Sequence, residues 1–152
     1  MCSLVKMGKA YTFTKKYSEI SKVLTLPVSI RFTGVTQSYE THGIIDTGAI
    51  VSIISHNVVE RLGVQPQGYR FMDTASEKRV ITPIYNASIV LCEKLEISNL
   101  TVGDGILPDG EECLIGMDIL SLGDLAVTHF DSKTCISFRI PSLQSIELKE
   151  IV

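Results

Sequence analysis

The segment Gly43–Ala49, with the sequence Gly-Ile-Ile-Asp-Thr-Gly-Ala, constrains the fold more than any other stretch of the chain. Its first three residues are typical of the apolar end of a strand. Asp46 follows at once, where burial of a carboxylate is costly unless neighbouring groups compensate. Gly48 then permits a tight turn and a close approach by another backbone or a ligand. Two interpretations follow: a catalytic acid or base at a strand end, or an ordinary turn, since Asp and Gly favour turns for local reasons.

Two segments together resemble the active-site segments of retropepsin-like aspartic proteases. The first is Ile44-Ile45-Asp46-Thr47-Gly48-Ala49, followed by Ser52-Ile53-Ile54. The second, Leu114-Ile115-Gly116-Met117-Asp118-Ile119-Leu120, is similar to the family's apolar-apolar-Gly strand and the short helix after it. Seventy residues separate Asp46 from Gly116, which leaves room for a helix, a flap hairpin and one more strand. The resemblance covers roughly residues 25–140 and suggests a bacterial-type, single-domain member.

The resemblance implies an all-β fold, a closed retropepsin-like acid-protease barrel with one or two short helices and a flap hairpin. It makes Asp46 the catalytic residue, with support from the active-site loop residues Thr47, Gly48 and Ala49. The loop-supporting strand would be Leu114, Ile115 and Gly116. The flap candidates, at the tip of a hairpin expected over residues 69–91, are Met72, Asp73, Thr74, Ala75, Ser76 and Glu77. This tip has no glycine, whereas many flaps of the family are glycine-rich.

Each chain carries a single Asp-Thr-Gly and therefore half of a paired-carboxylate site. The resemblance thus implies a homodimeric aspartic endopeptidase, in which Asp46 of each copy helps to activate water for peptide-bond hydrolysis. The alternative is a catalytically silent retropepsin-like domain used for peptide binding or dimerisation. A third hypothesis, a paired-carboxylate hydrolase acting on sugars, has little support because the chain has no tryptophan to stack on a sugar ring.

Neither a cofactor nor a metal is expected, because His42, His56 and His129 share no ligand spacing. The polar loop 103–112 is interpreted as a surface loop and not as a calcium loop, since Ile106 and Pro108 occupy positions where calcium needs oxygen ligands. Asp118, near the start of a short helix, is expected to serve the helix amides in preference to catalysis.

Composition narrows the partners and the compartment. The chain is 45% hydrophobic and 20% charged, has no apolar run near the roughly 18 residues of a membrane span, and begins without the apolar core of a signal peptide. Its four cysteines lack paired spacing and fit reduced core thiols. The cytoplasm is therefore the expected compartment. Five lysines in residues 1–24 are interpreted as a solvated face, so the expected partners are a second copy and a peptide or protein substrate, not nucleic acid or membrane.

The chain is expected to divide into an N-terminal arm of uncertain structure (1–24), the protease domain (25–140) and a C-terminal tail (141–152) that could add a strand to an interface. Ser55 is expected to cap a helix that ends at Gly63. Strands are expected over residues 24–32, 41–46, 49–54, 95–102 and 113–115. A short helix is expected over 117–122, and a closing hairpin over 125–140.

Overall fold

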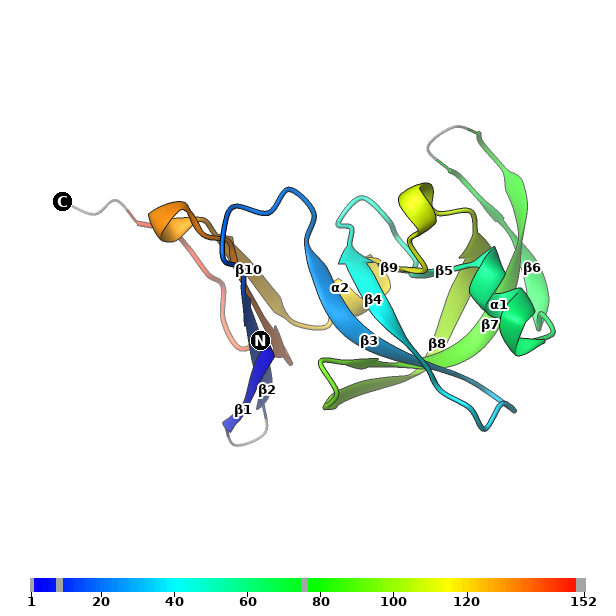
Figure 1. The fold of residues 1–152 in the computed structure, drawn as a ribbon, viewed down its shortest axis with the longest axis horizontal. Coiled ribbons are helices and arrows are strands. Elements are labelled where there is room, and N and C mark those ends of the chain that lie inside the picture. The colour runs from blue at the N-terminus through cyan, green and yellow to red at the C-terminus, as the bar shows by residue number, and fades with distance from the viewer. Residues whose placement is uncertain (1, 8–9, 75–76, 150–152) are drawn as a thin grey trace. The chain divides into compact units, whose positions relative to one another are not determined.

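The computed structural model describes residues 2–7, 10–74 and 77–149, with side chains from Ala10 onward (Figure 1). The chain forms two compact units. One is continuous, Val23–Ile119, and the other combines the two ends of the chain, Met1–Lys22 with Leu120–Val152.

The continuous unit is a closed β-barrel. Its strands follow the order β3-β4-β9-β5-β8-β7-β6, and a further pairing of β3 with β7 closes a ring of six described strands, with β6 outside it. The bounds are β3 (Thr25–Phe32), β4 (Tyr39–Ile45), β5 (Ile53–Ser55), β6 (Gly68–Met72), β7 (Val80–Leu91), β8 (Leu95–Gly105) and β9 (Cys113–Ile115). The predicted all-β barrel is confirmed.

Alternation of apolar residues explains the barrel core. On β3 the buried positions are Leu26, Val28, Ile30 and Phe32, which point to one side of the strand and alternate with more exposed residues. The long strand β7 contributes side chains to the same interior through Ile89 and Leu91, which are fully buried. Because every barrel strand has two neighbours, backbone groups are paired around the whole ring.

Short helices follow two of the barrel strands. Helix α1 (His56–Leu62) buries Val58 and Val59 and ends at Gly63, whose φ of 63° is the left-handed conformation predicted for it. Ser55 occupies the N-cap, but its hydroxyl makes no capping hydrogen bond and is buried without a partner. Helix α2 (Met117–Leu120) follows β9, and a 3-10 turn, η1 (Pro108–Gly110), lies in the preceding loop.

The second unit is an antiparallel sheet in the order β1-β2-β11-β10. Its strands are β1 (Cys2–Met7), β2 (Ala10–Lys16), β10 (Asp124–Thr128) and β11 (Cys135–Ile140), with a 3-10 turn η2 (Phe130–Ser132) between the last two. Phe13 and Phe138 are buried opposite each other, with ring centroids 5.7 Å apart. Asp124 accepts hydrogen bonds from Arg139, from the Ser142 hydroxyl and from the Leu143 amide. This hub ties the start of the C-terminal tail to the sheet.

Several element boundaries differ from the sequence-based expectation. The strand expected over residues 49–54 begins only at Ile53, because the carbonyls of Ala49 and Ile50 instead accept the amides of Met117 and Asp118. Strand β8 continues to Gly105, so residues 103–105 are not loop; they pair with β5 in parallel. The helix after Gly116 ends at Leu120, and the first strand of the closing hairpin, expected to begin at residue 125, spans Asp124–Thr128.

Of the cysteines whose side chains the structure describes, two are free thiols and one forms a disulfide. Cys113 is a free thiol whose complete burial raises its pKa to about 12, and Cys135 is free and half-buried. Cys92 is disulfide-bonded, so the expectation of reduced thiols is wrong at this position.

In the part of the chain that the structure describes, no helix has the length and apolar character to cross a bilayer.

A carboxylate network joins β4 to the segment before β9. Glu112 accepts hydrogen bonds of 2.7 Å from both the Tyr39 and the Thr41 hydroxyls, and Arg61 of α1 donates to Tyr39 at 2.6 Å. Burial raises the pKa of Glu112, but the two hydrogen bonds and the charge of Arg61 lower it by more, so the net pKa lies below its ordinary 4.5. The ionised Glu112 side chain therefore stabilises the folded barrel.

We predict that Glu112→Gln lowers the free energy of unfolding by about 1–2 kcal/mol at pH 7. Because the folded pKa lies below 4.5, the difference from wild type is complete above that value and disappears as the pH falls through the folded pKa. Urea unfolding at pH 7 and pH 3 measures it. The neighbouring Glu111→Gln is the control, with an expected change within about 0.5 kcal/mol; an equal loss in both variants would contradict the prediction.

Candidate functional site

Asp46 lies at the end of β4 in a turn that closes on its own carboxylate. Its amide donates to the Ile115 carbonyl at 3.0 Å, and its Oδ1 accepts the Gly48 amide at 2.8 Å. A Cβ atom at Gly48 would lie only 3.1 Å from that same Oδ1, so glycine keeps the turn uncrowded. Asp46 is half-buried and Thr47 is exposed. The carboxylate is thus oriented by a backbone amide and remains open to solvent.

Strand β9 lies between the strand that enters this turn and the strand that leaves it (Figure 1). It pairs in parallel with β4, placing Ile45 opposite Ile115, and antiparallel with β5, placing Ile53 opposite Leu114. The structure therefore brings Leu114, Ile115 and Gly116 against the loop that carries Asp46, although they are far from it in sequence.

A buried tie connects the two segments that the sequence singled out. Asp118 accepts the Ser52 amide at 3.0 Å through Oδ2 and the Ser52 hydroxyl at 2.7 Å through Oδ1. The same hydroxyl accepts the Gly116 amide at 3.0 Å. Asp118 Oδ1 also accepts the amide of Ile119. Asp118 thus has the structural role expected of it, and it serves the Asp46 loop as well as its own helix.

Ser52 holds these segments together, a role that its place in the matched segment did not reveal. It is fully buried and stands between Val51 and Ile53 in an otherwise apolar run. A lone hydroxyl within such a run was the available signal, because a buried polar group is retained only where it finds partners.

Gly116 is required by a close approach of two backbones. A Cβ atom there would lie 2.8 Å from the Val51 carbonyl carbon and 2.9 Å from the Ala49 oxygen. Beside it, the Met117 amide donates to that Ala49 oxygen at 2.8 Å. Any side chain at residue 116 would push the Asp46 loop away from β9.

The flap candidates lie on the β6–β7 hairpin, which extends beyond the barrel. Among them, Met72, Asp73, Thr74 and Glu77 are described, whereas Ala75 and Ser76 lie outside the described residues. The Thr74 hydroxyl bonds the backbone of Glu77, and Asp73 accepts the Arg79 amide at 2.9 Å. Side chains therefore hold the hairpin end in place of a glycine turn.

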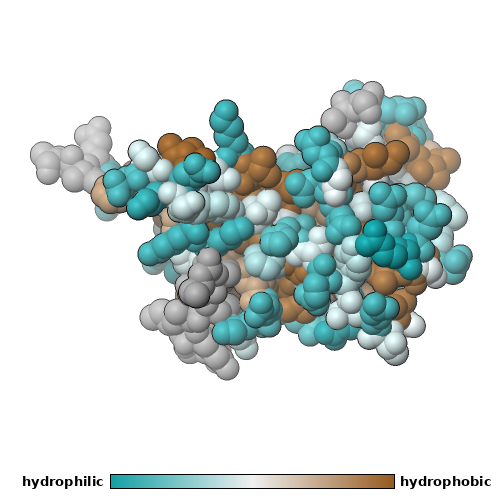
Figure 2. All heavy atoms as spheres, in the orientation of Figure 1, coloured by the Kyte–Doolittle hydropathy of each residue, from teal (hydrophilic) through white to brown (hydrophobic). Residues whose placement is uncertain are grey.

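The two faces of this hairpin differ. Met72 packs on one face toward Gly103 of β8, where a Cβ atom would lie 3.1 Å from the Met72 sulfur. The other face exposes Tyr69, Phe71 and Ile81, each more than 60% accessible, and Arg79 stacks over Phe71. Figure 2 shows hydrophobic surface over the part of the molecule where Figure 1 draws this hairpin.

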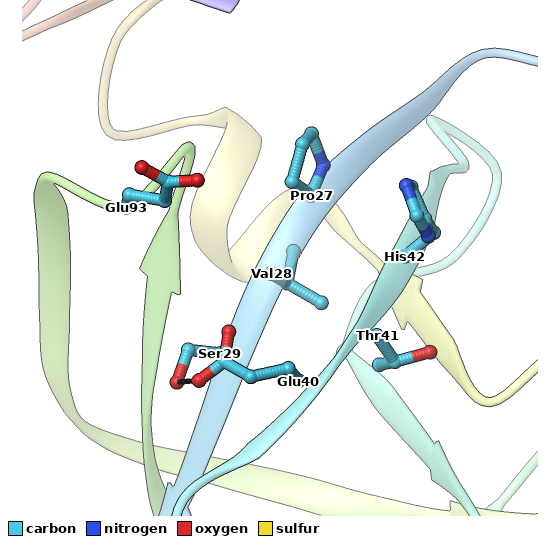
Figure 3. Close-up of a pocket in the computed structure, with 7 residues that line it drawn as sticks. All are labelled: Pro27, Val28, Ser29, Glu40, Thr41, His42 and Glu93. Atoms are coloured by element: carbon cyan, nitrogen blue, oxygen red, sulfur yellow. Dashed lines mark hydrogen bonds between the residues drawn. The ribbon is translucent and has the colours of Figure 1, made fainter.

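The hollow shown in Figure 3 is separate from the Asp46 loop. It has a volume of about 260 Å³ and lies over β3, β4 and the turn between β7 and β8. Its lining residues are Pro27, Val28, Ser29, Glu40, Thr41, His42 and Glu93. None of them is a predicted site residue, so this hollow does not belong to the candidate site.

The histidines are dispersed. His42 lines the hollow of Figure 3, His129 bonds the Thr134 hydroxyl, and His56 bonds Asp104 at 3.0 Å. The hydrogen bond to Asp104 raises the pKa of His56, and burial raises the pKa of Tyr85, which also bonds Asp104, to about 12. Within residues 2–7, 10–74 and 77–149, no cluster of three or more His, Cys, Asp or Glu side chains is arranged to hold a metal.

We predict that Ser52→Ala lowers the free energy of unfolding by about 1–3 kcal/mol, because it leaves the Gly116 amide and one Asp118 oxygen without their shared partner. Amide exchange at Gly116 should accelerate together with this loss. The exposed Ser98→Ala, also a serine truncation in the barrel, should change stability by less than about 0.5 kcal/mol. Similar losses in the two variants would show that the tie is not the cause.

The chain also matches a known protein family in sequence. The sequence model of the family described as "gag-polyprotein putative aspartyl protease" matches residues 33–122, which include both the Asp46 loop and Gly116. No curated protein matches the chain in sequence.

Two solved structures align with this chain. A retropepsin-like aspartic protease from Rickettsia conorii aligns over 90% of this chain and 99% of its own, with 15% identity and a TM-score of 0.51. The retroviral protease-like domain of Ddi1 from Leishmania major aligns over 84% of this chain and 100% of its own, with 19% identity and a TM-score of 0.44. Since the family match spans more than half of the sequence, the chain belongs to the gag-polyprotein aspartyl protease family and has a retropepsin-like fold.

Proposed function

We propose that this chain is an aspartic endopeptidase that works as a homodimer, with Asp46 of each copy forming the catalytic pair. The observation that carries the proposal is the placement of Asp46 on a loop fixed by the Ser52–Asp118–Gly116 tie, in a chain of an aspartyl protease family. The Asp46 carboxylate is accessible, and its Oδ1 is oriented by the Gly48 amide.

Two carboxylates about 3 Å apart cannot both ionise, so the pair holds one proton between them. The ionised member removes a proton from water, and the water oxygen attacks the carbon of the scissile amide. The protonated member donates its hydrogen bond to the carbonyl oxygen, on which negative charge develops. Return of a proton to the amide nitrogen then releases the amine, and neither carboxylate becomes covalently bound to the substrate.

The loop residues have separate roles in this scheme. Exposed Thr47 is available to the partner's loop, and Gly48 lets the two loops approach while its amide orients the carboxylate. The carbonyl of Ala49 anchors the loop through the Met117 amide. The β6–β7 hairpin would act as the flap that covers an extended peptide, with its Met72 face toward the barrel.

We propose that the chain works in the cytoplasm. We also propose that its partners do not include nucleic acid or a membrane.

A non-catalytic domain that binds peptides or dimerises is the second candidate. The observation in its favour is the hairpin end, which is closed by the side chains of Asp73 and Thr74 instead of a mobile glycine turn. Proteolysis that is blocked by a peptide mimic carrying a tetrahedral hydroxyl would exclude this candidate, because such a mimic resembles the transition state of hydrolysis.

We predict that Asp46→Asn reduces peptide cleavage by at least about 10³-fold, since it removes the group that accepts the proton from water. Asp109→Asn is the matched control: Asp109 is exposed, and its φ of 54° is one that asparagine tolerates. Cleavage of an apolar model peptide by the purified chain, followed by mass spectrometry, measures both variants. Cleavage that survives in Asp46→Asn would rule out the proposed mechanism.

Mixing the subunits tests whether each copy supplies one half of the site. When wild type and Asp46→Asn exchange subunits freely at equal amounts, only about one quarter of the dimers carry two aspartates. Activity per total protein should therefore fall to about a quarter of the wild-type value. A fall to only about one half would indicate that each subunit acts alone, contrary to the proposal.

A further inference from the structure

We infer that Ile50 and Met117 form an apolar contact with a second copy of this chain, next to the paired Asp46 residues. This inference rests on the proposed function, because that function requires two Asp46 loops to meet. It goes beyond it by naming the side chains that hold the copies together.

Ile50 is a large apolar side chain that the chain itself does not bury. It belongs to the run Ala49–Ile54, whose apolar character predicts burial, yet it is 82% exposed. The reason is local: the Ile50 carbonyl accepts the Asp118 amide at 3.1 Å while Ser52 turns inward to make the buried tie. The loop geometry that serves Asp46 thus presents Ile50 to solvent.

Met117 belongs to the same surface through the backbone. Its amide bonds the carbonyl of Ala49, the residue next to Ile50, at 2.8 Å, and its side chain is 37% exposed. Ile50 and Met117 therefore sit on adjoining positions of two segments that the Ser52–Asp118–Gly116 tie holds rigidly together.

Chain length limits how far Ile50 can lie from the catalytic pair. Four residues of chain span at most about 14 Å, so Ile50 lies within that distance of Asp46. A standard interface buries about 800 Å² on each partner, equivalent to a disc roughly 16 Å in radius. An interface centred on the two Asp46 carboxylates therefore reaches Ile50.

The absence of charge on the loop favours a second copy of this chain as the partner that covers Ile50. A two-fold axis brings residues close to their own copies, so that a charged side chain beside the axis would repel its twin. The loop from Thr47 to Ile53 contains no charged residue. Apart from the Asp46 pair, which shares one proton, two such loops can approach without charge repulsion and bury Ile50 from both sides.

The test is Ile50→Asp, measured by sedimentation over a wide range of protein concentration. The dimer dissociation constant should rise at least about 100-fold, because two buried isoleucines are lost per dimer and each is worth roughly a factor of ten or more. The circular dichroism spectrum should not change, since the side chain is already exposed in the single chain. Ile50→Val should stay within about threefold of wild type, and Met117→Ser should weaken the dimer by about tenfold.

Ile106→Asp is the matched control. Ile106 is 97% exposed, follows β8, and is not one of the two side chains that the inference assigns to the contact. The same substitution there should leave the dissociation constant within about threefold of wild type. If the dissociation constant of Ile50→Asp equals that of wild type and its KM for peptide rises instead, Ile50 faces the substrate. The inference is then wrong, while the proposed function stands. A wild-type chain that remains monomeric at every concentration overturns the proposed function and this inference together.

Discussion

The hydroxyl of Ser52 is the interaction on which the candidate site depends. It donates to Asp118 and accepts from Gly116, so one buried group joins the loop after β4 to the segment after β9. Such a group is costly when unpaired and stabilising when both of its hydrogen bonds are made. The position of the Asp46 carboxylate follows from this pairing, since the Asp46 amide also bonds the last residue of β9.

The closed barrel makes this tie possible. Because β9 pairs with β4 on one side and β5 on the other, the chain entering and leaving the Asp46 turn is held against one short strand. The Glu112 network fastens the same strands at their other end, through Tyr39 and Thr41 of β4. Strand β9, which supports the Asp46 loop, is therefore held at both of its ends. The β6–β7 hairpin, in contrast, reaches out from the barrel and is held at its end by its own side chains.

Much of the fold could be predicted from local pattern. The alternation along β3, the left-handed stop at Gly63 and the short apolar strand at Cys113–Ile115 all express preferences of neighbouring residues. The pairing of an Asp-Thr-Gly turn with a distant apolar-apolar-Gly strand indicated the family. What local pattern missed was the start of β5. The apolar residues Ile50 and Val51 are typical of a strand, but the carbonyls of Ala49 and Ile50 accept the amides of Met117 and Asp118 instead of continuing β5.

The sequence by itself determined the chemistry available at the site: one carboxylate in a small-residue turn, a second glycine-bearing segment to support it, and no second copy of the motif within the chain. Only the tertiary structure decided that Ser52 turns inward to join these segments while Ile50 turns outward to solvent. The physical reason is that both residues stand in one apolar run, and their directions are set by hydrogen-bond partners more than sixty residues away in the chain. Local propensity contains no information about such partners, and closure of the barrel supplies it.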